Sequence, residues 1–155
     1  MSGIIPKLVV FDTNICLDFF VFHDPRYLCI LEWLKEGKIH GLTSSACRDE
    51  WLAVLNYPHL PINDEQRPIA ITEFDATIKI KDDFIYSAIR LPLCSDKDDQ
   101  KFLETALGLR VDYLVSKDKA LLKLARRLSK LELFKIVTPE QFLNDLTIND
   151  IQTTS

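Results

Sequence analysis

The stretch Lys7–Phe11, together with the acid that follows it, constrains the fold most strongly. After its first residue it is a continuous apolar run, and it ends at Asp12. Such a run is typical of a strand buried on both faces of a parallel sheet, and parallel sheets carry helices on both faces. The start of the chain therefore predicts an α/β fold.

The remainder of the chain alternates predicted strands and helices. Further strands are predicted at 39–42, 112–116 and 134–137, and helices at 15–22, 27–36, 46–55, 82–89, 99–107 and 120–131. Residues 69–81 combine β-branched residues with a weak helical pattern, so helix and strand both stay open there. Thr138–Gln141 has the capping-box pattern of a helix start, with proline at the first helical position. This alternation predicts a three-layer α/β/α fold around a central, mainly parallel sheet.

The chain of 155 residues has the length of one domain, and its composition, 47% hydrophobic and 27% charged, is typical of globular proteins. No apolar run approaches the roughly 20 residues that span a membrane, and no apolar leader precedes Asp12. We therefore expect a cytoplasmic protein. The four cysteines lack the spacing of a zinc or redox site, and no glycine-rich nucleotide-binding motif occurs.

Acidic residues recur where the carboxyl ends of the predicted strands meet, the edge at which α/β folds form their sites. They are Asp12 after the first strand, Asp118 after the strand 112–116, Asp96, Asp98 and Asp99 ahead of the helix 99–107, and Glu50 within the helix 46–55. Each alone has a simpler interpretation, because an aspartate before a helix is commonly an N-cap and a helical glutamate commonly faces solvent. Together they predict a cluster of carboxylates.

Carboxylates gathered in one place repel one another, so the cluster needs either protonation or a bound cation. Ligands that are all oxygen, with no histidine or cysteine among them, favour Mg²⁺ or Mn²⁺. Such a cation polarises a phosphodiester and makes water a nucleophile near neutral pH. The predicted cluster therefore indicates metal-dependent hydrolysis of a phosphodiester.

Four segments resemble, in order, the acidic motifs of the PIN-domain ribonucleases. They are VFDTN (10–14), RDEWLAVL (48–55), SDKDDQKFLETAL (95–107) and DYLVSKDKALL (112–122), and TPEQFL (138–143) fits the family's C-terminal pattern. The likeness is greatest to the VapC-like toxins of bacterial and archaeal toxin–antitoxin pairs. It implies a single PIN-like domain over residues 1–155, with a matched core at about 7–143 and a short tail at 144–155.

The resemblance implies a Mg²⁺- or Mn²⁺-dependent endoribonuclease. In that family the metal site would comprise Asp12, Glu50 and Asp99, and Asp118 would complete the acidic pocket as a further catalytic acid. The resemblance also implies an antitoxin protein that holds the toxin inactive, and a homodimer.

Three supporting positions follow from the same resemblance. Asn14 would help to hold the site through its side-chain amide, and Ser116 stands where the family usually has threonine. Asp98 and Asp99 are adjacent, and helical register favours Asp99 as the ligand.

Basic residues gather in the segment 117–135, although the whole chain has a net charge of −4. Candidate contacts for RNA phosphates there are Lys117, Lys119, Arg126 and Arg127. A solvated helix face explains these residues almost as well.

Two other classes of function stay open. Asp12-Thr13-Asn14 after a strand resembles the nucleophile motif of haloacid-dehalogenase-like phosphatases, but those enzymes need an acid where this chain has Asn14. The other alternative is a non-catalytic PIN fold that binds RNA or protein, a role that gives no reason to keep a repulsive cluster of acids.

Overall fold

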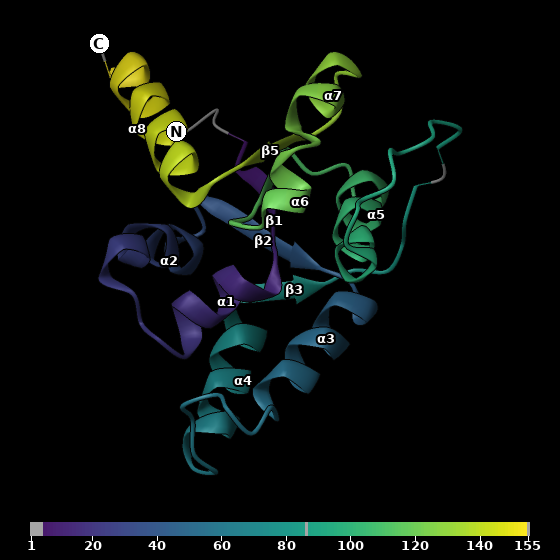
Figure 1. Cartoon of the computed structure of the whole chain (residues 1–155). Helices are drawn as coiled ribbons and strands as arrows, with labels where there is room; N and C mark the ends of the chain where they lie inside the picture. Colours follow the sequence, from purple (N-terminus) through teal and green to yellow (C-terminus); the bar gives the residue numbers. More distant parts are fainter. Residues whose placement is uncertain (1–4, 86, 155) are drawn as a thin grey trace.

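A five-stranded sheet lies at the centre of the computed structural model, which describes residues 5–85 and 87–154. The strand order is β3-β2-β1-β4-β5, and every pair of neighbours is parallel (Figure 1). The strands are β1 (Lys7–Phe11), β2 (Ile39–Thr43), β3 (Ile78–Ile80), β4 (Tyr113–Val115) and β5 (Lys135–Val137). Because all of them run the same way, their carboxyl ends meet at one edge of the sheet.

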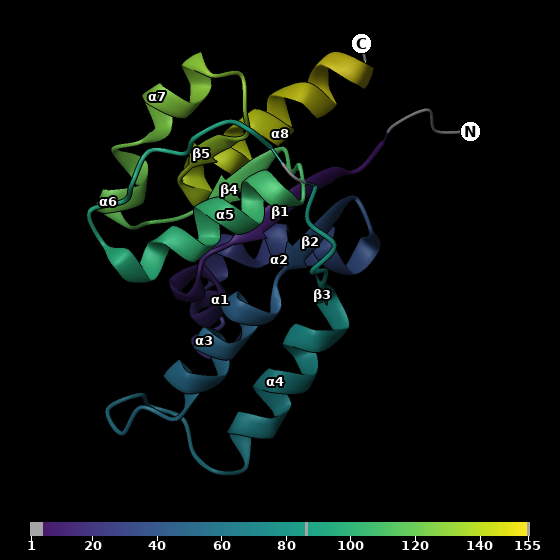
Figure 2. The ribbon, with the colours of Figure 1, turned by 90° about the vertical axis from the view of Figure 1, so that its right-hand side faces the viewer.

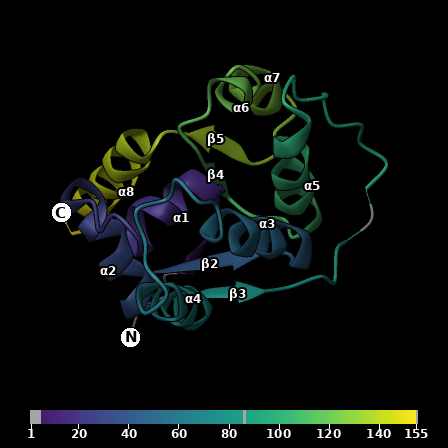
Figure 3. The ribbon, with the colours of Figure 1, turned by 60° about the horizontal axis from the view of Figure 1, so that its bottom comes forward.

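Helices cover both faces of this sheet, and Figure 3 shows α5 on the side opposite α2 and α8. The helices are α1 (Thr13–Phe20), α2 (Leu28–Glu36), α3 (Ser45–Leu55), α4 (Gln66–Thr77), α5 (Gln100–Gly108), α6 (Lys119–Leu122), α7 (Ala125–Lys130) and α8 (Pro139–Thr154), with 3₁₀ turns η1 (Pro25–Tyr27) and η2 (Lys97–Asp99). The helices α3 and α4 extend away from the sheet as a pair (Figure 2).

Successive side chains of the strands fill two separate apolar layers. In β1, Val9 and Phe11 pack in the layer that also holds buried residues of α1, α2, α4 and α8. Val10 points the other way, into the layer formed with α5, α6 and α7, and Leu114 of β4 joins it there. This alternation, with both faces buried, confirms the predicted three-layer α/β/α fold and explains why β1 is apolar at successive positions.

Several element boundaries follow from residues that are recognisable in the sequence. Gly37 ends α2 in the left-handed conformation, with φ at 77°. The capping box at α8 is reciprocal: the Gln141 N–H donates to the Thr138 hydroxyl at 3.1 Å, and the Thr138 N–H donates to the Gln141 side chain at 2.9 Å. These local signals were sufficient to place both boundaries.

The helix predicted at 82–89 is wrong for the residues that the structure describes there; Tyr86 lies outside them. Asp82 instead accepts hydrogen bonds from the N–H (2.9 Å) and the hydroxyl of Ser45 at the start of α3. The Ile85 N–H donates to the Gly108 carbonyl at 2.8 Å, and Phe84 lies so close that a Cβ on Gly108 would be 2.6 Å from its Cγ. Contacts with α3 and α5 therefore hold this segment in a non-helical conformation.

The single helix predicted at 120–131 is interrupted. The helix α6 ends at Leu122 and α7 begins at Ala125, and between them the Leu124 N–H bonds to the carbonyl of Leu121 at 3.0 Å, a tighter i→i+3 turn. Leu121 of α6 and Leu128 of α7 are both fully buried, so both helices contribute to the same apolar layer.

The two remaining segments are more regular than the sequence indicated. Residues 69–81, for which helix and strand were both open, contain the end of α4 and then β3 at the edge of the sheet. The segment 144–155, predicted as a short tail, continues α8 as far as Thr154.

Candidate metal centre

Asp12 and Asp118 lie at the carboxyl ends of neighbouring strands. The register pairs Phe11 of β1 with Val115 of β4, and the Asp12 N–H donates to the Val115 carbonyl at 3.2 Å. Each aspartate then begins a helix as its N-cap, Asp12 for α1 and Asp118 for α6. The parallel pairing of these two strands therefore brings the two acids to the same edge.

Both carboxylate oxygens of Asp12 accept hydrogen bonds. Oδ1 accepts the N–H of Ile15 at 3.1 Å, Oδ2 accepts the hydroxyl of Ser116, and the residue is only 3% exposed. Burial raises the pKa of Asp12 to about 6, the bonds from Ser116 and Ile15 lower it, and the charge of Asp118 raises it. Asp12 is therefore a buried acid that is still mostly ionised at pH 7.

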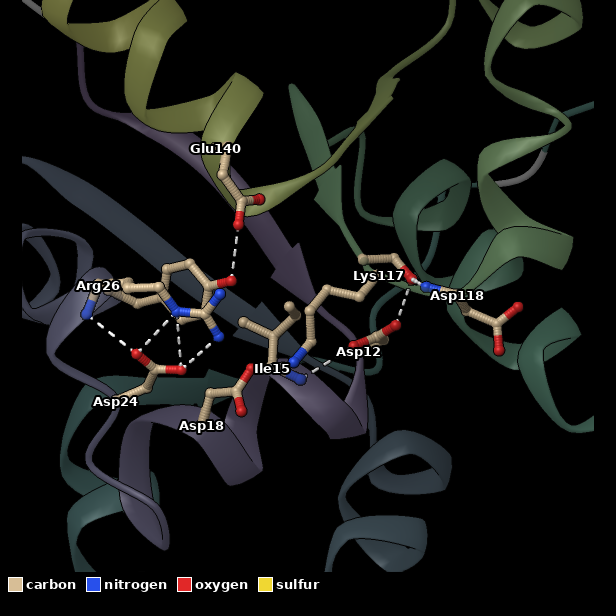
Figure 4. Close-up of polar contacts among 10 residues, drawn as sticks. Asp12, Ile15, Asp18, Asp24, Arg26, Lys117, Asp118 and Glu140 are labelled. Atoms are coloured by element: carbon tan, nitrogen blue, oxygen red, sulfur yellow. Dashed lines mark hydrogen bonds and ion pairs between the residues drawn. The ribbon is translucent and has the colours of Figure 1, made fainter.

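The hydroxyl of Ser116 joins Asp12 to Asp118. While it donates to Asp12, it accepts the backbone N–H of Asp118 at 2.9 Å, and the Asp118 Oδ1 accepts the N–H of Ala120 at 2.7 Å. Figure 4 shows the Asp118 carboxylate turned away from Asp12. This orientation presents Asp118 to other acids.

Those acids are Asp96 and Asp99. One carboxylate oxygen from each of Asp96, Asp99 and Asp118 lies within 4.8 Å of the others, and we call these residues the three-aspartate cluster. The Asp99 Oδ2 is buried, and no N–H or hydroxyl group of the described residues donates to it. Burial, followed by the charge of Asp118 and a hydrogen bond with it, raises the pKa of Asp99 to about 7.

A divalent cation fits the three-aspartate cluster. All donors are oxygen, and an octahedral Mg²⁺ places its ligand oxygens about 3–4 Å apart, within the observed spread. The buried Asp99 Oδ2 also favours a cation here. Burying a carboxylate oxygen without a donor costs free energy of folding unless a proton or a cation satisfies it. The cluster therefore has both the chemistry and an unsatisfied atom that a cation would complete.

Asp98 and Asp99 differ clearly in position. Asp98 is exposed, and its contact with the site is a backbone N–H that donates to the Asp96 Oδ1 at 3.0 Å. Asp99 is half-buried and belongs to the three-aspartate cluster. The structure thus brings Asp99 to the site and leaves the Asp98 side chain outside it.

Glu50 of α3 lies outside the three-aspartate cluster. Its Oε1 is 3.0 Å from the Nζ of Lys101, and its Oε2 accepts a hydrogen bond from the hydroxyl of Thr13. Burial lowers the pKa of Lys101, but the bond to Glu50 and its charge outweigh this, so the pKa is raised overall. In this structure Glu50 is paired with a lysine rather than gathered with the aspartates.

Sequence reasoning missed three residues that shape this region. Thr13 and Lys101 hold Glu50, and Asp96, noted only as part of an acidic run, belongs to the cluster. Thr13 stands next to Asp12, and Lys101 is two residues beyond Asp99, but this spacing did not indicate that both would reach α3. Asn14 is exposed, and within the described part of the chain its side chain makes no hydrogen bond, so its supporting role stays a prediction.

The candidate RNA contacts divide into two kinds. Lys117 is held by Asp18 of α1, with 2.5 Å between Nζ and Oδ2 (Figure 4). Lys119, Arg126 and Arg127 are exposed, and none makes an ion pair within the described ranges. In Figures 1 and 2, α7, which carries both arginines, lies beyond α6 and away from α1.

Two hollows of the surface lie away from the three-aspartate cluster. One of 390 Å³ lies where β1, β4 and β5 begin, the opposite edge from the cluster. Another, of 520 Å³, lies between α7 and α8 and includes Arg126 and Lys135 in its lining. Neither of these two hollows has Asp96, Asp99 or Asp118 in its lining.

The fold and this acidic edge define a PIN domain, and a comparison with protein families agrees. The model of the PIN domain matches residues 8–120, so the chain belongs to the PIN domain family. No curated protein and no solved structure matches it. PIN domains are generally metal-dependent nucleases, and the three-aspartate cluster is a group of acids that could hold a metal ion.

One further observation concerns membranes. Among the described helices, none has the length and apolar character needed to cross a bilayer.

Proposed function

We propose that this PIN domain is a metal-dependent endoribonuclease that hydrolyses RNA phosphodiester bonds at the three-aspartate cluster. The observation that carries the proposal is the buried Asp99 Oδ2, which receives no N–H or hydroxyl donor from the described residues although two further carboxylates lie within 4.8 Å of the Asp99 carboxylate. Glu50, in contrast, is paired with the ammonium of Lys101.

Asp96, Asp99 and Asp118 would hold the cation, which is Mg²⁺ or Mn²⁺ by the chemistry of its ligands. When bound, the cation supplies positive charge that stabilises the phosphodiester in the transition state and favours attack by water. Burial and the charge of Asp118 raise the pKa of Asp99 to about 7, and a bound cation would favour the ionised form of Asp99.

Asp12 acts through Ser116 as a positioning residue. Its carboxylate fixes the hydroxyl that accepts the N–H of Asp118, and this bond sets the direction of the Asp118 side chain. Burial and two hydrogen bonds also make Asp12 a poor nucleophile, so these contacts do not favour an aspartyl-phosphate intermediate of the haloacid-dehalogenase type.

The proposal also includes a substrate, RNA, and a biological role as a toxin. We propose RNA because exposed Lys119, Arg126 and Arg127 follow Asp118 along the chain and could hold phosphates beside the cluster. The motif resemblance to VapC-like toxins supports a toxin that acts in the cytoplasm as a homodimer and is held inactive by an antitoxin protein.

An end-labelled RNA pool tests the proposed activity directly. The wild-type protein is incubated with it in Mg²⁺ or Mn²⁺ and, separately, in EDTA. Cleavage should need the cation and should be lost in Asp99→Asn, whereas Asp98→Asn, which removes the adjacent exposed charge, should cleave like the wild type. Equal cleavage by the two variants would refute the site. Metal-dependent binding of intact RNA without cleavage would indicate the non-catalytic binding module instead.

A further inference from the structure

Glu50 makes two specific contacts with residues outside the three-aspartate cluster. One carboxylate oxygen lies 3.0 Å from the Lys101 ammonium and the other accepts the Thr13 hydroxyl, so both oxygens are occupied. The side chains are 19% exposed for Glu50 and 30% exposed for Lys101, which places the pair at the rim rather than in open solvent. Screening by water is therefore weaker for this pair than for a fully exposed one.

Lys101 is also tied to the cluster through its own helix. It lies in the first turn of α5, two residues after Asp99, so the same short segment presents a cluster acid and the cation that holds Glu50. An ammonium group donates hydrogen bonds and has no lone pair, so Lys101 cannot act as a metal ligand while it is charged. Its charge instead satisfies Glu50 and opposes a second cation nearby.

We propose that Lys101 withholds Glu50 from the metal centre, so that Glu50 can join the ligands of a divalent cation only when the Glu50–Lys101 pair opens. This inference rests on the proposed function, because it concerns how that site takes up its cation. Glu50 would exchange one positive partner for another: its carboxylate would leave the ammonium of Lys101 and turn to the bound cation. Lys101 is thus a positioning residue that tunes cation affinity.

Calorimetric titration of the purified protein with Mn²⁺ tests this without any activity assay. Lys101→Met removes the charge at similar length, and we expect it to bind Mn²⁺ about tenfold more tightly, within the range usual for coupled sites. Lys97→Met is the matched control, since it removes an exposed charge from the neighbouring turn η2, where the lysine makes no ion pair among the described residues. Lys101→Arg keeps the charge and should bind like the wild type.

A double substitution separates release of Glu50 from a general change in charge. In a Glu50→Gln background, Lys101→Met should raise the affinity for Mn²⁺ by no more than the small gain that Lys97→Met gives. A tenfold gain that persists without Glu50, or equal effects of Lys101→Met and Lys97→Met, would overturn the inference. Lys101→Gln offers a second uncharged variant that can still donate a hydrogen bond to Glu50, and circular dichroism checks that each variant is folded.

Failure of the proposed function has a different signature. If neither the wild type nor Lys101→Met binds Mn²⁺ and no RNA is cleaved, the metal centre itself is refuted together with the role of Lys101. If the wild type binds Mn²⁺ and Lys101→Met binds with unchanged affinity, only the role of Lys101 is refuted.

Discussion

Replacing Asp12 by asparagine should stabilise the folded protein at pH 8, although Asp12 lies in the most buried part of the site. The cause is its buried charge, because burial raises the pKa from 3.8 to about 6. A pKa that is higher in the folded than in the unfolded chain means that ionisation opposes folding. The Asp12 charge lowers the free energy of unfolding by its full amount above about pH 6. This effect decreases as the pH falls and is absent below about pH 4.

The size of the effect follows from the pKa. At 1.36 kcal/mol for each pH unit, the change from 3.8 to about 6 corresponds to about 3 kcal/mol. Asparagine keeps a buried polar group, and its side-chain oxygen can accept the Ile15 N–H. The Asp12 carboxylate accepts a hydrogen bond from the Ser116 hydroxyl, whereas the asparagine amide N–H must donate one to the Ser116 oxygen. We therefore expect a gain of about 1–3 kcal/mol at pH 8, or about 3–9 °C in Tm for a chain of this size.

Urea unfolding in EDTA at pH 8 and at pH 4 measures this gain, with Asp98→Asn as the exposed control. Asp12→Asn should be more stable than the wild type at pH 8 and equal or slightly less stable at pH 4. A loss of stability at pH 8, or a gain of the same size at both pH values, would show that the buried charge of Asp12 does not oppose folding.

Three further predictions concern the cation, RNA and packing. Because the pKa of Asp99 is about 7, the affinity for Mn²⁺ should rise about tenfold from pH 6 to pH 8 in calorimetric titrations, and an affinity independent of pH would contradict that pKa. The double variant Arg126→Ala/Arg127→Ala should flatten the slope of RNA affinity against salt by about 1.4, and an unchanged slope would exclude these arginines from the interface. Gly108→Ala should lower the free energy of unfolding by about 1–3 kcal/mol, because its Cβ would meet Phe84 at 2.6 Å, and thermal melting that matches the wild type would contradict this contact.

Elements with strong local signals were predictable from the sequence. The strand β1 is apolar because it is buried on both faces, Gly37 ends α2, and the Thr138–Gln141 pair begins α8. Each of these signals depends on neighbours within a few residues. The same is true of Asp12 and Asp118, which the sequence placed at strand ends and the structure shows as N-caps.

Features that depend on distant partners were not predictable in this way. Residues 82–85 are held by Ser45 and Gly108, both far away in the sequence, and these contacts prevent the helix predicted at 82–89. The pairing of Glu50 with Lys101 depends on how α3 packs beside α5, which no local spacing encodes. Local spacing therefore did not indicate that Glu50 would pair with Lys101 while the acids of the three-aspartate cluster lie together.

Anomalous diffraction from crystals soaked in Mn²⁺ tests the central claim most directly. We predict an anomalous peak bounded by the carboxylates of Asp96, Asp99 and Asp118, and its absence from crystals of Asp99→Asn soaked in the same way. A peak at another place, or no peak in well-diffracting wild-type crystals, would contradict a metal centre at the three-aspartate cluster.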